Sequence, residues 1–305
     1  MNRFLRNCIL IFFVMLIFCT GCSSKIREQK NAPCRDNTPQ VLVPCATGVT
    51  VYTSDAATLD ASNASEGYIM VKYNGNNSKV KLQIATPKKT TYTYLLSGHD
   101  LLETFPLTEG DGLYQFTVFE NVADDQYATI LSHTLEVHIS DKFKPFLYPN
   151  QYVNFTPQNA AITKSCYLAK GAISDLDVVT NIYNYVIDTI SYDTRLAQHV
   201  SYDYLPNIDQ TLQSKKGICF DYSALMTAML RSQRIPTKLE VGYSSDNYHA
   251  WISTYVDDIG WVDHVIEFNG HSWSLMDPTL AASNDSHHVK NYLKDEGNYI
   301  VKYTY

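Results

Sequence analysis

The hydrophobic pattern changes its period near Pro145 and Pro149, and this change constrains the fold more than any other feature of the chain. Before it, short runs alternate apolar with polar residues and end at turn signals such as Asn74-Gly75. A period of two places apolar side chains on one face of a strand. After it, apolar residues recur at steps of three and four, which is the period of a helix. The pattern therefore predicts an all-β region followed by a region that begins with helices.

The all-β region is expected to cover residues 41–145. Its expected strands share the alternation of apolar and polar residues, and they are 68–73, 79–84, 91–96, 113–119 and 132–139. Several short strands at close spacing predict a β-sandwich. The immunoglobulin fold is an analogy only, because the region shows no Cys–Trp–Cys pattern.

The second region, residues 150–305, is predicted to be α+β, with helices first and strands after them. Ser174 can cap the first helix, and Asp177 lies in its first turn, where a carboxylate is favourable. The expected helices are 174–190, 208–214 and one that begins near Cys219 and ends before Pro236. The expected strands are 238–243, 250–256, 261–268 and 272–276.

The N-terminus has the features of an export signal. Arg3 and Arg6 precede an uninterrupted apolar run from Ile9 to Phe18. This run is shorter than the roughly 20 residues that span a bilayer, and it fits the apolar part of a signal peptide. The small residues before Cys22 resemble a bacterial lipobox, although Cys19 stands where an aliphatic residue is more usual. We therefore expect a lipoprotein signal over residues 1–21, lipidation of Cys22 and a tether over 22–40.

An ordinary secretory signal and an uncleaved membrane anchor are the alternatives to the lipoprotein signal. All three hypotheses place the rest of the chain outside the cytoplasm, and the first predicts a lipid-anchored protein on the extracytoplasmic face of the cell membrane. Cys34 and Cys45 lie close in sequence and could pair in such an oxidising compartment, which the sequence leaves open. Cys166 is expected to be a buried small hydrophobe.

The charge of the chain excludes one class of partner. The formal charge is −7 at pH 7. Removal of residues 1–21 takes away two arginines and no acid, so the formal charge of the remainder is −9. An acidic protein without a basic run is unsuited to binding nucleic acid through its own charge.

Three residues have the chemistry of a nucleophilic site. Cys219 follows Gly217, which is expected to allow a tight turn, and it lies at the start of a helix. The free N–H groups and the positive end of the helix dipole at that position favour a thiolate. His249 opens an expected strand and Asp277 closes another. In a Cys–His–Asp triad the imidazole takes the thiol proton and the carboxylate orients the ring.

The order of these residues resembles the transglutaminase-like superfamily over roughly residues 170 to 280. The matching positions are Gly217 and Cys219, Arg231 with Ile235-Pro236, Gly242-Tyr243, His249-Ala250-Trp251, and Trp273 with Asp277-Pro278-Thr279. The resemblance implies a papain-like fold with Cys219 as nucleophile, His249 as base and Asp277 as orienting group. It also suggests Tyr192 as an oxyanion donor beside the backbone N–H of Cys219, while a core tyrosine is the equal alternative. Arg234 departs from the family, which usually has Gly before Ile-Pro.

The leading hypothesis is an enzyme that forms a thioester at Cys219 from a protein or cell-wall peptide amide. Hydrolysis would make it a cysteine protease or amidase, transfer to an amine would make it a protein-glutamine acyltransferase, and the sequence does not choose between them. No cofactor or metal is expected, although Cys, His and Asp can all bind zinc. The alternatives are a non-catalytic surface binding or scaffold module with a relic triad, and an adhesin with an internal isopeptide or thioester bond.

Overall fold

The computed structural model describes residues 33–98, 100–244, 247–257, 259–263, 266–268, 273–275 and 299–305. The expected signal, the lipidation residue Cys22 and the expected triad residue Asp277 lie outside this part of the chain. Cys34 to Tyr305 belong to one compact unit. Among the described residues, no helix has both the length and the apolar character needed to cross a membrane.

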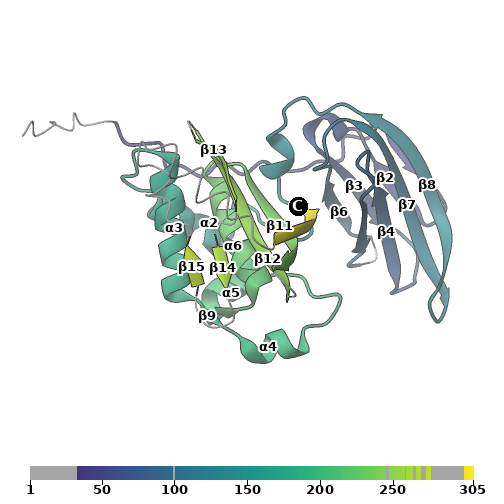
Figure 1. Cartoon of the computed structure of the whole chain (residues 1–305). Helices are drawn as coiled ribbons and strands as arrows, with labels where there is room; N and C mark the ends of the chain where they lie inside the picture. The colour runs from purple at the N-terminus through teal and green to yellow at the C-terminus, as the bar shows by residue number, and fades with distance from the viewer. Residues whose placement is uncertain are drawn as a thin grey trace, which may run out of the picture. The chain divides into compact units, whose positions relative to one another are not determined.

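The N-terminal region forms two antiparallel sheets of four strands each (Figure 1). The first has the order β1-β2-β3-β6, with β1 Val51–Thr53, β2 Ala57–Asp60, β3 Tyr68–Tyr73 and β6 Leu102–Pro106. The second has the order β5-β4-β7-β8, with β4 Val80–Ala85, β5 Thr91–Leu95, β7 Gly112–Ala123 and β8 Gln126–Val137. Short 3-10 turns lie at Ala64–Glu66 and Lys144–Phe146.

Alternating side chains join the two sheets in one core. In β4 the apolar residues Val80, Leu82 and Ile84 are buried, while the residues between them are half-buried. Tyr94 of β5 contacts Phe105 of β6 across the two sheets, with ring centroids 4.8 Å apart. This is the packing that a period of two dictates, and all five expected strands are present. β1, β2 and β6 were not predicted, and the immunoglobulin analogy stays a prediction.

The second region is α+β, as expected. Its helices are α2 Ala160–Leu168, α3 Asp175–Thr189, α4 Thr194–His199, α5 Ile208–Ser214 and α6 Cys219–Ser232. A four-stranded antiparallel sheet has the order β13-β12-β11-β16, with β11 Thr237–Ser244, β12 Asn247–Val256, β13 Gly260–Val262 and β16 Tyr299–Thr304. Two-stranded sheets pair β9 Ser191–Tyr192 with β10 Lys216–Gly217, and β14 Ile266–Phe268 with β15 Trp273–Leu275. The central helix α6 contacts α2, α3 and α5 as well as β11 and β12.

The start of α3 confirms the cap read from the sequence. The Ser174 hydroxyl accepts the N–H of Asp177 at 3.1 Å, and the Asp177 carboxylate accepts the N–H of Ser174 at 3.0 Å. This reciprocal capping box satisfies two N–H groups that a helix leaves without an internal partner. The apolar face of α3 is buried, as its period predicts.

Residues 34–40, which the sequence analysis placed in the tether, contact the α+β region. The N–H of Arg35 donates to Ala172 O at 2.7 Å, and its guanidinium forms an ion pair with Asp175. The N–H of Gln40 donates to Ser232 O at 2.7 Å at the end of α6. These bonds fix this stretch of backbone on the folded unit.

The other described cysteines, Cys34, Cys45 and Cys166, form no disulfide bond. Cys34 and Cys45 are free and exposed. Cys166 was expected to be buried but is half-buried, and the side-chain amide of Asn37 donates to its carbonyl at 2.8 Å. The docking of residues 34–40 therefore covers part of Cys166.

A buried cation joins three segments of the fold. Arg231, near the end of α6, is 1% exposed. Its guanidinium donates to the carbonyls of Thr237 at 2.9 Å, Tyr148 at 2.6 Å and Tyr305 at 2.8 Å. Burial lowers the pKa of Arg231 to about 9, which leaves the group charged at neutral pH. The Arg of the Arg-x-x-x-Ile-Pro motif thus holds β11, β16 and the connection between the two regions.

Candidate active site

Cys219 is the first residue of α6, as the sequence predicts. The carboxylate of Asp221 accepts the N–H of Ile218 at 2.8 Å, which satisfies one of the free donors at the helix start. The other carboxylate oxygen accepts the hydroxyl of Tyr204 at 2.6 Å. Burial raises the pKa of Asp221, while these two bonds favour its ionised form. Asp221 therefore fixes the turn that presents Cys219 and attaches the loop of Tyr204 to it.

Gly217 is needed at this site for space. It lies in the extended strand β10 and does not have a positive φ. A Cβ at this position would lie 2.7 Å from the Cβ of Asp221, which is closer than real side chains approach. The chain passes from β10 to α6 within two residues, as expected, and the glycine lets the capping carboxylate pack against the backbone at this turn.

The side chain of Cys219 is half-buried at the start of α6. Burial raises the pKa of the thiol above its usual value, and this effect outweighs the amides of Ala250, Phe220 and Cys219 itself, which lower it. The helix start alone therefore does not produce a resting thiolate. Removal of the proton requires a base.

β12 carries His249 to the same place. One of the amides that lower the pKa of the Cys219 thiol belongs to Ala250, the residue that follows His249 in the strand. His249 is 9% exposed and stacks with Trp251, with ring centroids 6.4 Å apart. The first turn of α6, which carries Cys219, thus lies next to the strand that carries His249.

The partner of Trp251 is a buried acid. The indole N–H donates to Glu240 of β11 at 2.9 Å, and the hydroxyl of Ser253 donates to the same carboxylate oxygen at 2.6 Å. Burial raises the pKa of Glu240, and the two hydrogen bonds oppose this shift. Glu240 therefore holds the indole ring that lies next to His249.

Tyr192 lies near Cys219 and packs against the core, so its role as an oxyanion donor stays a prediction. It belongs to β9, which pairs with β10 in parallel so that Tyr192 is opposite Gly217. Burial raises the pKa of Tyr192, and the charge of the Cys219 thiolate raises it further. A phenol with a raised pKa remains a hydrogen-bond donor at neutral pH.

The third triad residue, Asp277, lies outside the described residues. The described part of β15 ends at Leu275, two positions earlier, and β14, its partner, contacts β12. Its role as orienting group stays a prediction. The described residues contain no group of three or more His, Cys, Asp or Glu that could hold a metal, and His287-His288 also lies outside them.

Sequence reasoning missed Asp221, Tyr204 and Glu240. Asp221 had a usable signal, because an acid two residues after a helix-starting Cys is in the first turn and can cap it. Tyr204 and Glu240 had none, because each acts through a partner that is brought near only by the fold.

Comparison with known proteins identifies this region. Residues 163–264 match the model of the Transglutaminase-like superfamily. This part of the chain is a transglutaminase-like core. A UPF0252 protein from Methanocaldococcus jannaschii is 26% identical over 294 residues, which cover 83% of this chain and 80% of the relative. Both Cys219 and the start of β12 fall within the matched core.

Solved structures with similarity to the chain are distant. One is a candidate cysteine protease from Cytophaga hutchinsonii, 14% identical, with 70% of this chain and 67% of that chain covered and a TM-score of 0.34. Another is the transglutaminase of red sea bream, 12% identical, with 72% and 49% covered and a TM-score of 0.24.

Proposed function

We propose that the protein is a cysteine enzyme that acts on protein or peptide amides through a thioester at Cys219. One observation carries the proposal: Cys219, in the first turn of α6, lies next to β12, the strand that carries His249, and the amide of Ala250 in that strand lowers the pKa of its thiol. The transglutaminase-like core supplies the context, because it covers both residues.

The chemistry follows from the state of the thiol. Since burial keeps Cys219 protonated, His249 takes the proton as the sulfur attacks the carbonyl carbon of the substrate amide. The resulting imidazolium gives that proton to the leaving nitrogen, and the C–N bond breaks to leave an acyl-thioester. Attack by water then releases a carboxylic acid and hydrolyses the amide, while attack by an amine forms a new amide. Either step regenerates the Cys219 thiol.

Two further roles belong to the same proposal. The backbone N–H of Cys219 and the phenol of Tyr192 would donate to the oxyanion of the tetrahedral intermediates. Asp277 would hold the His249 ring and stabilise its charged form. The position of Tyr192 opposite Gly217 supports the first role.

The location of the enzyme is also proposed. The Arg-containing apolar start and the lipobox-like residues before Cys22 support lipidation of Cys22 and attachment to the extracytoplasmic face of the cell membrane. The substrates would then be proteins or cell-wall peptides outside the cytoplasm.

Capture of the thioester tests the mechanism. The full chain, purified in detergent, is incubated with a library of glutamine-containing peptides, with and without a primary amine, and its peptides are analysed by mass spectrometry. We expect an acyl adduct on Cys219 that is lost in Cys219→Ala and kept in Cys166→Ala. A peptide product with water alone indicates hydrolysis, and an amine-linked product indicates transfer. Unchanged turnover by Cys219→Ala would reject the mechanism.

A non-catalytic scaffold is the second candidate, because the raised pKa of Cys219 is the property of an inert thiol. Reaction with iodoacetamide at pH 7 separates the two functions. An active Cys219 labels faster than Cys166, whereas equally slow labelling of both supports the scaffold.

A further inference from the structure

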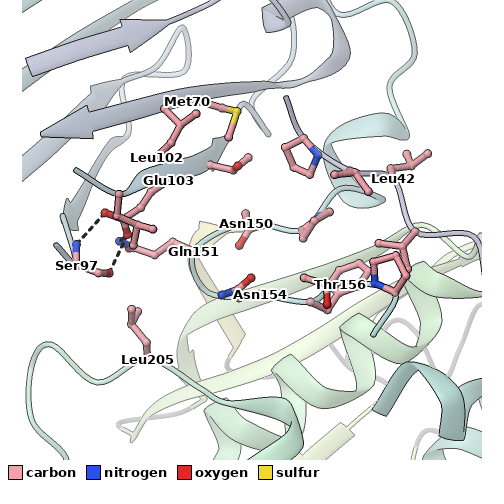
Figure 2. A pocket seen from close by; sticks show the side chains of 18 of the residues that line it. Leu42, Met70, Ser97, Leu102, Glu103, Asn150, Gln151, Asn154, Thr156 and Leu205 are labelled. Atoms are coloured by element: carbon pink, nitrogen blue, oxygen red, sulfur yellow. Dashed lines mark hydrogen bonds between the residues drawn. The ribbon is translucent and has the colours of Figure 1, made fainter. Parts of the chain in front are cut away.

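A cleft of about 650 Å³ lies along β6 (Figure 2). Its lining includes the apolar residues Leu42, Met70 and Leu102 and the polar residues Glu103, Asn150 and Gln151. This volume is within the range of sites that bind small molecules or short peptide segments. Neither Cys219 nor His249 lines it.

β6 is the terminal strand of its sheet, so one edge of its backbone has no strand partner among the described residues. The N–H of Leu107 donates to Gly67 O on the β3 side, whereas Thr104 O accepts the N–H of Gln151 on the other side. Because backbone groups alternate along a strand, Leu102 presents its N–H and C=O to the same open edge as Thr104.

The cleft surrounds this open edge. Leu102 and Glu103 are adjacent in the strand and point to opposite faces of the sheet, yet both line the cleft. A cavity lined from both faces of a terminal strand must run along its edge. An occupant would therefore meet the free backbone of Leu102 as well as the side chains above and below it.

The polar groups of the cleft are held in place. Glu103 is 8% exposed, and its carboxylate accepts the N–H and hydroxyl of Ser97, each at 2.8 Å, and the amide of Gln151 at 2.7 Å. The same Gln151 amide donates to Leu95 O at 2.6 Å. Gln151 thus joins the edges of the two sheets and fixes one wall of the cleft.

Asn150 adds an unused donor. Its side-chain oxygen accepts the N–H groups of Tyr152 and Val153, each at 3.0 Å, which fixes the orientation of the amide. Its side-chain nitrogen has no hydrogen-bond partner among the residues that the structure describes, although Asn150 is only 5% exposed. Buried donors without a partner are rare in folded proteins, and this one lies in the wall of the cleft.

We propose that the β6 cleft binds an extended polypeptide segment, which pairs with the outward N–H and C=O of Leu102 at the edge of β6. A peptide offers the alternating N–H and C=O groups that match Leu102, and its carbonyls suit the Asn150 donor. The apolar wall takes alternate side chains of the bound segment. A linear sugar chain lacks this spacing of donors and acceptors.

Two residues that line the cleft, Gln151 and Leu205, are adjacent in sequence to residues that contact the first turn of α6. Gln151 precedes Tyr152, whose ring contacts Phe220 in the first turn of α6, with centroids 5.4 Å apart. Leu205, which also lines the cleft, follows Tyr204, the partner of Asp221. A role for the bound segment as part of the substrate rests on the proposed function, whereas the binding itself does not.

Binding is tested in the Cys219→Ala full chain, purified in detergent and applied to an array of random 12-residue peptides and an array of oligosaccharides. Leu102→Pro removes the outward N–H at the first position of an edge strand, where proline is tolerated. Val51→Pro is its matched control, because Val51 opens β1 at the opposite edge of the same sheet, with 38% exposure against 37% for Leu102. Asn150→Asp removes the donor and keeps the oxygen that holds the turn.

We expect the Cys219→Ala chain to bind a subset of the peptides with saturation. Leu102→Pro and Asn150→Asp should each weaken this binding about tenfold, with thermal unfolding unchanged, and Val51→Pro should leave it within twofold. Absence of saturable peptide binding, binding of sugars alone, or equal binding by all variants would overturn the proposal. Acyl capture is measured separately, in the chain that keeps Cys219. Peptide binding without an acyl adduct would reject the proposed function and leave the assignment of the cleft unaffected.

Discussion

At the scale of single residues, Cys219 is subject to two opposing influences. Backbone N–H groups from α6 and β12 favour its thiolate, while burial favours its thiol and prevails. In the proposed mechanism, His249 controls the reactivity of Cys219 at neutral pH.

His249→Ala should slow the labelling of Cys219 by iodoacetamide at pH 7 by at least tenfold, within the range seen for loss of a general base. Because the pKa of the thiol is raised, its ionised fraction grows only as the pH becomes alkaline, and the labelling rate of the variant should rise there. Mass spectrometry of Cys219 against pH gives both rates, with Cys166 as internal reference. Equal rates at pH 7 with and without His249 would contradict this role.

Gly217→Ala should destabilise the fold by about 1–3 kcal/mol, because the added Cβ would overlap the Cβ of Asp221. It should also lower the reactivity of Cys219, since Asp221 would have to leave the helix start. Urea unfolding and thiol labelling report the two effects. Gly98→Ala is the control, because its Cβ would lie 3.9 Å from its nearest neighbour. A variant as stable as this control would show that Asp221 can move without cost.

At the scale of elements, the turn after α6 shows how this chain compensates for its departure from the family. Arg234 has a φ of 65°, in the left-handed region that favours glycine. Its guanidinium donates to the carbonyls of Thr38 at 2.7 Å and Asp36 at 2.5 Å. Arg234 therefore has a strained backbone conformation, and its side chain attaches the segment 34–40 to the end of α6.

Comparison of Arg234→Gly with Arg234→Ala separates these two effects. Both lose the contacts with the segment 34–40, so trypsin should cleave after Arg35 faster in each. Only the glycine relieves the backbone strain, which makes it the more stable variant by about 1 kcal/mol in urea unfolding. An alanine variant as stable as the glycine variant would show that the left-handed backbone carries no strain.

The same elements show what sequence alone can and cannot predict. The α3 cap, the strand alternation and the start of α6 at Cys219 were predictable because each depends on neighbours within a few residues. α2 lacks a strong apolar face, and β16 is separated from its partner β11 by more than fifty residues, so neither had a local signal. At the site, Cys219, His249 and Tyr192 followed from motif and resemblance, while Tyr204 and Glu240 depend on contacts made by the fold.

At the scale of the whole molecule, the buried guanidinium of Arg231 holds several segments of the fold together. Arg231→Lys keeps the charge. The lysine ammonium, on its flexible side chain, cannot donate to the carbonyls of Tyr148, Thr237 and Tyr305 with the geometry of a planar guanidinium. Each buried carbonyl left without a donor costs about 1–3 kcal/mol. We expect a loss of about 2–5 kcal/mol in urea unfolding, against a change within about 0.5 kcal/mol for the exposed Arg195→Lys. Similar stability of the two variants would contradict a joining role.

The attachment of Arg231 to Tyr305 has a consequence for the order in which the protein matures. During synthesis, α6 and β11 leave the ribosome well before β16, so the guanidinium lacks one of its carbonyl acceptors until Tyr305 has emerged. A nascent chain that collapsed early would bury this cation without that acceptor, which is unfavourable. We therefore expect the sheet that carries His249 to form only after β16 arrives, so that Cys219 and its proposed base come together late in folding.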